Sequence, residues 1–241
     1  EPRIGIKYAI NEKQSINLGA GLHSQTQPYY TYFYQQYDST SEQYLMHNQK
    51  MDLTKSFHSV IGYDYAINAT TRFKAETYFQ YLYNVPVEVT PSAFSLSNMG
   101  SGFARFFPDK LQNTGTGTNM GVEITLEKFF NKSFFFLFTA SVFDAKYKGS
   151  DGIERNTDYN GKYATNLLVG KEFKTGDKST LSLGTKITLA GGKWYGYVDT
   201  AASNYQNELV FLDSAYNTRQ FHPYFRADFK IRTAFSTFLK S

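Results

Sequence analysis

The residues of this sequence that are best suited to binding a ligand are aromatic side chains in two short stretches. Their rings offer flat apolar faces and their hydroxyl or indole groups offer hydrogen bonds, which suits sugars and other flat ligands. Both stretches lead into long segments without a strand pattern, so the same rings would also serve as an aromatic girdle at a membrane interface. The candidate ligand-binding residues are Tyr29, Tyr30, Tyr32, Tyr34, Trp194, Tyr195 and Tyr197.

Residue patterns for catalysis or metal binding are weak. The stretch from Gly115 to Gly121 differs from a dinucleotide fingerprint, because its last glycine is one residue late and a strand pattern follows it. Glu123 and Glu127 are about 13 Å apart along a strand, farther than glycosidase carboxylates. We therefore expect no catalytic residue, no metal and no cofactor. The histidines, which lack metal-site spacing, are His23, His47, His58 and His222.

Three acidic residues between Gly149 and Gly161 are candidate calcium ligands. Asp151, Glu154 and Asp158 lack the spacing of an EF-hand loop. A polar hairpin tip is the simpler interpretation of this segment.

Composition narrows the class of protein. The net charge of +4 is small and scattered, whereas nucleic-acid binding needs a concentrated basic face, so no nucleic-acid partner is expected. The absence of cysteine argues against a disulfide-stapled domain. Twenty Tyr and 22 Phe are more than a packed soluble core needs, but aromatic girdles in membranes use many of them.

Hydropathy alone resembles that of a soluble protein, with a mean of -0.45. No run of about 18 apolar residues is present, so a transmembrane helix is excluded. Transmembrane barrels alternate apolar and polar residues, which lowers their mean hydropathy, so the value is compatible with a membrane barrel.

Alternation of apolar and polar residues recurs along the chain and predicts nine long strands. In the clearest one, Phe73 and Ala75 share one face while Arg72 and Lys74 share the other. The register of the sixth strand is ambiguous because residues 134–138 are apolar on both faces. The predicted strands are residues 3–10, 15–22, 58–67, 72–81, 120–127, 133–148, 163–173, 181–189 and 225–232.

The connections between these strands alternate between short and long. Outer-membrane barrels have this asymmetry, with short periplasmic turns and long extracellular loops, whereas a soluble sandwich or lipocalin barrel has no reason for it. The tight turns are predicted at residues 11–14, 68–71, 130–132 and 175–178, and the long loops at about 35–50, 84–114, 149–161 and 190–221.

Charge is confined to one face of the clean strands. Arg72, Lys74 and Glu76 share a face, and the opposite face carries no charge. A charged side chain at the bilayer midplane costs about 2–4 kcal/mol. The charged face is therefore predicted to line the lumen and the apolar face to contact lipid.

Several stretches resemble the later barrel strands of TonB-dependent receptors of the Bacteroidetes type. This resemblance implies a 22-stranded barrel, an N-terminal plug domain and energy supplied by the TonB system from the periplasmic side. The stretches, which span nearly the whole chain, are Glu1–Gly5, Asn17–Gln25, Phe73–Tyr83, Val85–Val87, Gly121–Lys128, Tyr147–Gly152 and Pro223–Ile231.

The expected architecture is an all-β, antiparallel transmembrane barrel. Residues 1–241 are expected to form one partial barrel domain, without a plug and without the remaining strands, since bacterial single-chain barrels have even strand numbers. The tail Thr233–Ser241 ends where further strands are expected. The expected location is the bacterial outer membrane. The expected partners are outer-membrane lipid, a small imported ligand, and the TonB system only through the missing N-terminal part.

The function implied by the resemblance is TonB-dependent uptake of a siderophore, glycan, peptide or other nutrient. Two rival hypotheses stay open. One is a small porin-like or structural barrel without a plug, and the other is an outer-membrane enzyme.

Overall fold

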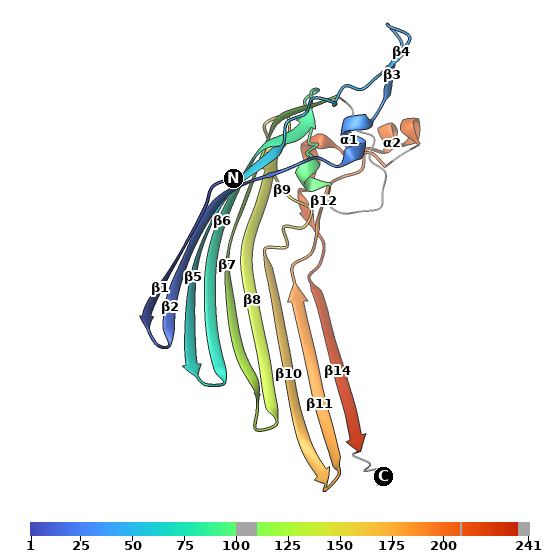
Figure 1. The fold of residues 1–241 in the computed structure, drawn as a ribbon. Coiled ribbons are helices and arrows are strands. Elements are labelled where there is room, and N and C mark those ends of the chain that lie inside the picture. The colour runs from blue at the N-terminus through green and yellow to red at the C-terminus, as the bar shows by residue number, and fades with distance from the viewer. Residues whose placement is uncertain (100–109, 208, 236–241) are drawn as a thin grey trace, which may run out of the picture.

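The computed structural model describes residues 1–99, 110–207 and 209–235. Within them, nine long strands follow one another in a single curved antiparallel sheet, each paired with the next along the chain (Figure 1). All nine predicted strands are present. They are β1 (Arg3–Asn11), β2 (Gln14–Gln25), β5 (Thr54–Asn68), β6 (Thr71–Glu88), β7 (Leu111–Asn131), β8 (Phe134–Lys148), β10 (Tyr163–Gly176), β11 (Ser179–Ala190) and β14 (Tyr224–Phe235).

Tight turns join the strands in pairs at one end of the sheet. Two of these turns are built alike, because the Asn11 and Asn68 side chains each accept a hydrogen bond from the backbone N–H two residues later, at 2.9 Å. At the β7–β8 turn, Lys132 and Ser133 both have positive φ, as a two-residue hairpin of type I′ requires. This turn and the β10–β11 turn lie slightly later than predicted, because β7 and β10 continue to Asn131 and Gly176.

The four long connections lie at the opposite end (Figure 1). Their predicted bounds need correction, most of all for the first, which begins after Gln25 rather than near Gln35. No helix among the described residues is long and apolar enough to cross a membrane. The short elements of these loops are α1 (Tyr29–Phe33), β3 (Gln36–Asp38), β4 (Gln43–Leu45), η1 (Leu96–Asn98), β9 (Glu154–Asn156), β12 (Trp194–Tyr195), α2 (Thr200–Gln206), η2 (Asp213–Ala215) and β13 (Arg219–Gln220).

Strand β6 runs farther than its alternation predicted. It was expected to end at Tyr81 but continues to Glu88, across an irregularity in its pairing with β7 between Leu82 and Val85. Asn84 has a positive φ of 55° at this point. Such a bulge shifts the side-chain parity, so the pattern of period two disappears although the strand goes on. Residues 100–109 of the predicted 84–114 loop lie outside the described residues.

The pairing register places the apolar residues on one face, here called the outward face. Thr77 pairs with Val122, which pairs with Val142, and the two valines are 52% and 66% exposed in the chain by itself. The opposite face, here called the lumen face, carries most of the charged residues of the strands. Arg72 contacts Asp64 at 2.6 Å there, and Lys74 contacts Glu76 at 2.6 Å.

The ambiguous register of β8 is resolved by its neighbours. Phe136 pairs with Lys128 and with Val169 on the outward face, and Phe135 lies on the lumen face beside Gly170. A Cβ atom at Gly170 would lie 2.2 Å from the Phe135 ring, so the missing side chain makes room for the aromatic ring.

An apolar band of defined height crosses the outward face. On β7 its margins are Lys128, near the turns, and Thr118, whose partner on β8 is Lys146. The ten residue steps between them span about 33 Å along the strand, or about 25 Å along the barrel axis at a usual tilt. That height equals the apolar band of outer-membrane barrels. Asp144, one outward position inside the loop-side margin, is paired with Lys162 at 2.5 Å.

The buried apolar core lies at the loop end. Val85, Val87, Ala93, Leu111 and Tyr147 are at most 7% exposed, and all come from the ends of β6, β7 and β8 or from the loop above them. Tyr147 points to the lumen face by its pairing with Gly117. The long loops therefore fold inward over the lumen side of these strands.

Candidate ligand site below the long loops

A hollow opens on the lumen face directly below the long loops. Its upper chamber has a volume of about 340 Å³ and its lower chamber about 260 Å³. The two chambers share Gln25, Thr54 and Leu82, so they form one continuous depression along β2, β5 and β6. A hollow of this size suits a small ligand or one end of a larger one.

The upper chamber is lined by uncharged side chains. Hydrogen-bonding groups come from Gln25, Gln27 and Ser97, and apolar walls come from Leu82 and Leu96. No Asp, Glu, Lys or Arg is found among the described residues that line this chamber. Such a lining holds a ligand by hydrogen bonds and ring contacts rather than by ion pairs.

Two stacked histidines line the lower chamber. The rings of His23 and His58 are 4.2 Å apart at 12° and their Nε2 atoms are 3.4 Å apart, so only one of the two nitrogens can act as donor toward the other. Beside them the Gln80 amide donates to the Ser56 hydroxyl at 3.0 Å. The lower chamber is therefore a polar surface of imidazole, amide and hydroxyl groups.

Tyr30 reaches the hollow because the first long loop is anchored at its start. The buried Gln27 side chain donates to the Asp52 carbonyl at 3.2 Å and to the Thr54 hydroxyl at 2.9 Å. The Tyr32 hydroxyl accepts a hydrogen bond from the Gln27 backbone at 3.2 Å. These contacts hold α1 above the hollow, with Tyr30 on its wall and Tyr29 81% exposed.

The second group of predicted aromatic residues, in the β11–β14 loop, is engaged in contacts within that loop and with the β8–β10 loop. The Trp194 indole donates to the Asn160 carbonyl at 2.6 Å, the Tyr195 ring stacks on Phe221 at 4.3 Å, and the Arg219 guanidinium lies 4.4 Å from the Tyr197 ring. Of the seven candidates, Tyr30 lines the hollow, while Tyr34 follows α1 as its C-terminal cap. A ligand-binding role for the seven stays a prediction.

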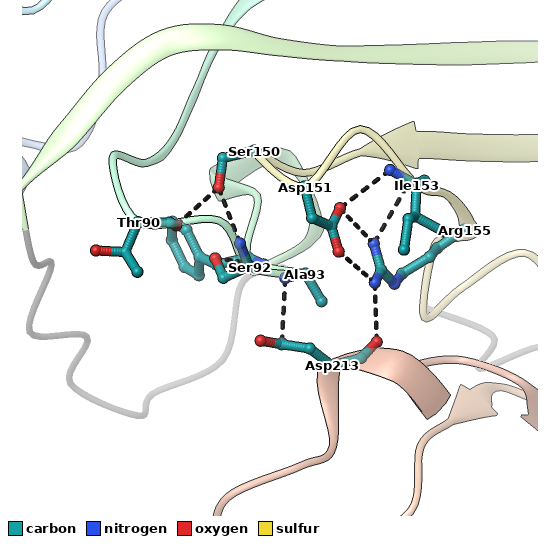
Figure 2. Close-up of polar contacts among 9 residues, drawn as sticks. Thr90, Ser92, Ala93, Ser150, Asp151, Ile153, Arg155 and Asp213 are labelled. Atoms are coloured by element: carbon teal, nitrogen blue, oxygen red, sulfur yellow. Dashed lines mark hydrogen bonds and ion pairs between the residues drawn. The ribbon is translucent and has the colours of Figure 1, made fainter.

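A cluster of polar contacts, here called the loop clasp, joins three long loops (Figure 2). It consists of Arg155 and Asp151 from the β8–β10 loop, Asp213 from the β11–β14 loop and Ala93 from the β6–β7 loop. Arg155 donates to both carboxylate oxygens of Asp151 at 2.9 and 2.6 Å and to the Asp213 carbonyl at 2.8 Å. The Asp213 carboxylate accepts from the Ala93 backbone at 3.1 Å. The Arg155 side chain is only 5% exposed, so these bonds are shielded from water.

A second set of contacts links the same three loops. The Asp158 carboxylate accepts from the amides of Asn98 at 2.8 Å and Asn217 at 2.7 Å. Nearby, burial together with Asp158 and Asp213 raises the pKa of Tyr216 to about 12, so this phenol stays neutral. The loops above the hollow thus form one connected unit.

Asp151 and Asp158 of the β8–β10 loop therefore act as loop anchors, whereas Glu154 contacts Lys146 of β8. Among the described residues, no group of three His, Cys, Asp or Glu side chains is placed to hold a metal ion. The only sequence signal for the clasp is an acidic and a basic residue four positions apart, Asp151 and Arg155. Nothing local points to Ala93 or Asp213, because they lie far away along the chain.

Low pH is expected to open the loop clasp. The hydrogen bonds from Arg155 hold the pKa of the Asp151 carboxyl below its usual value of 3.8. The stabilisation is therefore complete above that value and is lost as the pH falls through the lowered pKa. Limited proteolysis of the loops along a pH series should show this opening. An Asp151→Asn variant, whose side chain does not titrate, should lack that transition, and an identical transition in both proteins would contradict this assignment.

Gly149 is expected to tolerate no side chain. A Cβ atom there would lie 2.4 Å from the Ser92 carbonyl oxygen and 3.1 Å from the Ala93 backbone, so the β6–β7 loop would have to move. We expect Gly149→Ala to lower the free energy of unfolding by about 1–3 kcal/mol, as overpacking does. Denaturant titration checks this. Gly19→Ala is the control, because nothing lies within 4 Å of that Cβ position, and equal losses for both variants would refute the packing argument.

Comparisons with known proteins identify the fold. A scan against protein-family models and a search of curated proteins each find no match to this chain. Among solved structures, the chain is similar to the ferric-catecholate import receptor Fiu from E. coli K12, with a TM-score of 0.62 and 14% identity over 95% of this chain. The chain spans 28% of the length of that receptor.

A FadL homologue from Pseudomonas aeruginosa is also matched, at 11% identity over 78% of this chain and 60% of the other, with a TM-score of 0.25. That score is too low to support an argument. The likeness to Fiu, together with the antiparallel meander, confirms the predicted fold class of an outer-membrane β-barrel. The described wall resembles the barrel of an import receptor.

Proposed function

We propose that this chain forms part of the wall and mouth of a TonB-dependent import receptor in the bacterial outer membrane, of the Bacteroidetes type that its strand sequences resemble. The observation that carries the proposal is the inward fold of the cross-linked loops over a hollow on the lumen face. An open pore has no need of such a cover. The likeness to the Fiu barrel supports the same class of protein.

In this role the chain binds and guides its ligand without covalent chemistry. The ligand first meets Tyr30 and the uncharged groups of the upper chamber, and then the imidazole and amide groups below. Uncharged walls favour a ligand that is recognised by hydrogen bonds and ring stacking. The plug and the contact with the TonB system are assigned to other parts of such a receptor.

The direction of the strands argues against the rival of a small closed barrel. Because nine strands alternate in direction, β1 and β14 run the same way (Figure 1). Direct closure would pair them in parallel, whereas bacterial single-chain barrels are antiparallel with even strand numbers. We therefore assign the described strands to a larger barrel in which at least one further strand lies between β14 and β1.

Uptake and conductance together test this proposal. Labelled ferric catecholate, oligosaccharide and oligopeptide are offered to cells that make the full-length protein, with and without a protonophore, and the purified protein is inserted into planar bilayers. We expect uptake of one probe that the protonophore abolishes, and no steady conductance. Uptake that is indifferent to the protonophore, together with a stable open-channel current, would establish the porin-like alternative.

A matched pair of tyrosine variants tests the hollow itself. Tyr30→Ala removes the ring on the wall of the upper chamber, and a lost ring contact of about 0.5–1.5 kcal/mol weakens uptake roughly two- to tenfold. Tyr205→Ala on α2 removes a ring that is 89% exposed and should leave uptake unchanged. Equal effects of the two variants on uptake would show that the hollow does not bind the imported ligand.

A further inference from the structure

A second feature lies on the outward face, at the margin of the apolar band nearest the loops. Pairing from Val142 along β8 places Lys146 and Lys148 on this face, opposite Thr118 and Thr116 of β7. Tyr81 of β6 pairs with Thr118 in one of these rows, and its ring lies 6.1 Å from that of Tyr83, which pairs with Lys55 of β5. Below these rows the face is apolar, apart from the paired Asp144, as far as Lys128.

A small hollow of about 130 Å³ lies between these side chains. Its walls are the ring of Tyr81, the hydroxyl-bearing Thr116 and Thr118, the two lysines, and Glu154 of β9. It has the volume for a compact headgroup fragment but not for a larger ligand. It also opens toward the surroundings of the barrel, since Lys146 and Lys148 lie on the outward face.

The charges around this hollow are unevenly matched. Lys146 contacts Glu154 at 3.0 Å and Asp144 at 3.7 Å, while Asp144 also contacts Lys162 at 2.5 Å. Lys148 is exposed and makes no ion pair with any residue that the structure describes. The three ammonium groups of this surface thus outnumber its two carboxylates, those of Asp144 and Glu154. One positive charge, that of Lys148, remains for an external anion.

We propose that this hollow binds the phosphate of a phosphorylated lipid in the outer leaflet. It lies directly above the apolar band, the level at which lipid headgroups sit, beside an aromatic pair typical of that level. Lysine is a common phosphate ligand, and threonine hydroxyls can donate further hydrogen bonds to the phosphate. The acyl chains of the lipid would follow Met120 and Val122, which are exposed outward below Thr118. This site does not depend on the proposed import function.

Glu154 gives the proposal a distinctive signature. Its carboxylate lines the hollow and repels a phosphate there, while its contact with Lys146 draws positive charge away from the ligand. Removal of this carboxylate should therefore strengthen phosphate binding. Removal of the ammonium group of Lys148, which makes no ion pair among the described residues, should weaken binding without disturbing the fold.

The test measures dissociation constants of the full-length protein for bis-phosphorylated lipid A, for the same lipid after dephosphorylation and for inorganic phosphate. We expect binding of the phosphorylated lipid alone, weakened about fivefold by Lys148→Gln and further by the Lys146→Gln, Lys148→Gln double variant. Glu154→Gln should tighten it. Lys171→Gln is the matched control, because this exposed outward lysine lies at the opposite margin, where Phe134 is its partner.

Three results would overturn the proposal. Equal binding of the dephosphorylated lipid would reduce the site to apolar contact, and competition by inorganic phosphate at similar concentration would make it a site for soluble anions. A loss in Lys171→Gln as large as that in Lys148→Gln would leave only general attraction to an anionic surface. The single Lys148→Gln variant keeps the test valid if the double variant does not fold.

Discussion

Replacing Arg155 with methionine is expected to release the loops above the hollow while the nine-stranded sheet stays intact. The methionine fills a similar volume but leaves the Asp151 carboxylate, which is 16% exposed, without its cation. It also removes the hydrogen bond to the Asp213 carbonyl. Breaking a buried ion pair from one side costs about 3–5 kcal/mol. The clasp joins loops rather than strands. The lost stability should therefore be confined to the loops above the hollow.

Hydrogen exchange measures this effect by segment. Protection should fall in residues 89–98, 149–158 and 209–217 and stay unchanged in the cores of β6 and β7. Arg226→Met is the matched control, because its ion pair with Asp228 is 61% and 43% exposed and such pairs contribute at most about 1 kcal/mol. Loss of protection throughout β7 would show that Arg155 supports the sheet rather than the clasp.

The same variant links the clasp to ligand binding. η1 carries Leu96 and Ser97 into the wall of the upper chamber, and its loop is held by the contacts of Ala93 and Asn98. Once these loops separate, the upper chamber loses one wall. Uptake should then fall in Arg155→Met although Arg155 itself does not line the hollow.

The strands were predictable from the sequence because alternation is a local property. Every long strand was found, and the main error was at β6, where the bulge near Asn84 reverses the parity of the side chains. The sixth strand could not be assigned a register, since Phe134–Phe138 are apolar on both faces. Only the pairing with β7 and β10 decides the register of this strand. The same pairing decides that Lys146 and Lys148 lie on the outward face.

The mouth was much less predictable, because its contacts join distant parts of the chain. Asp213 lies 120 residues from Ala93 and 58 from Arg155, and no local pattern connects them. The aromatic residues of the loops were recognised as a group, but composition could not separate a ring that lines a hollow from one engaged in packing. Trp194 illustrates this limit, since its indole N–H is used by the Asn160 carbonyl.

The assignment of the outward face to lipid predicts a large loss of stability for the variant Ile124→Arg. Ile124 lies on the outward face, four residues from Lys128 and six from Thr118, near the middle of the apolar band. An arginine there meets hydrocarbon, which costs about 2–4 kcal/mol at the bilayer midplane. The expected result is a loss of that size in the free energy of unfolding, measured by denaturant titration of the protein in phospholipid bilayers.

Thr125→Arg is the matched control for this substitution. Its position on the lumen face follows from pairing with Lys74 and Thr139, so the new guanidinium meets water and the neighbouring carboxylates. We expect a change within about 0.5 kcal/mol, as at an ordinary surface site. If Thr125→Arg were the costlier of the two, the faces would be reversed and the charged residues would point to lipid. Equal small effects would mean that neither face contacts hydrocarbon, so this pair of variants tests the membrane assignment independently of any structural likeness.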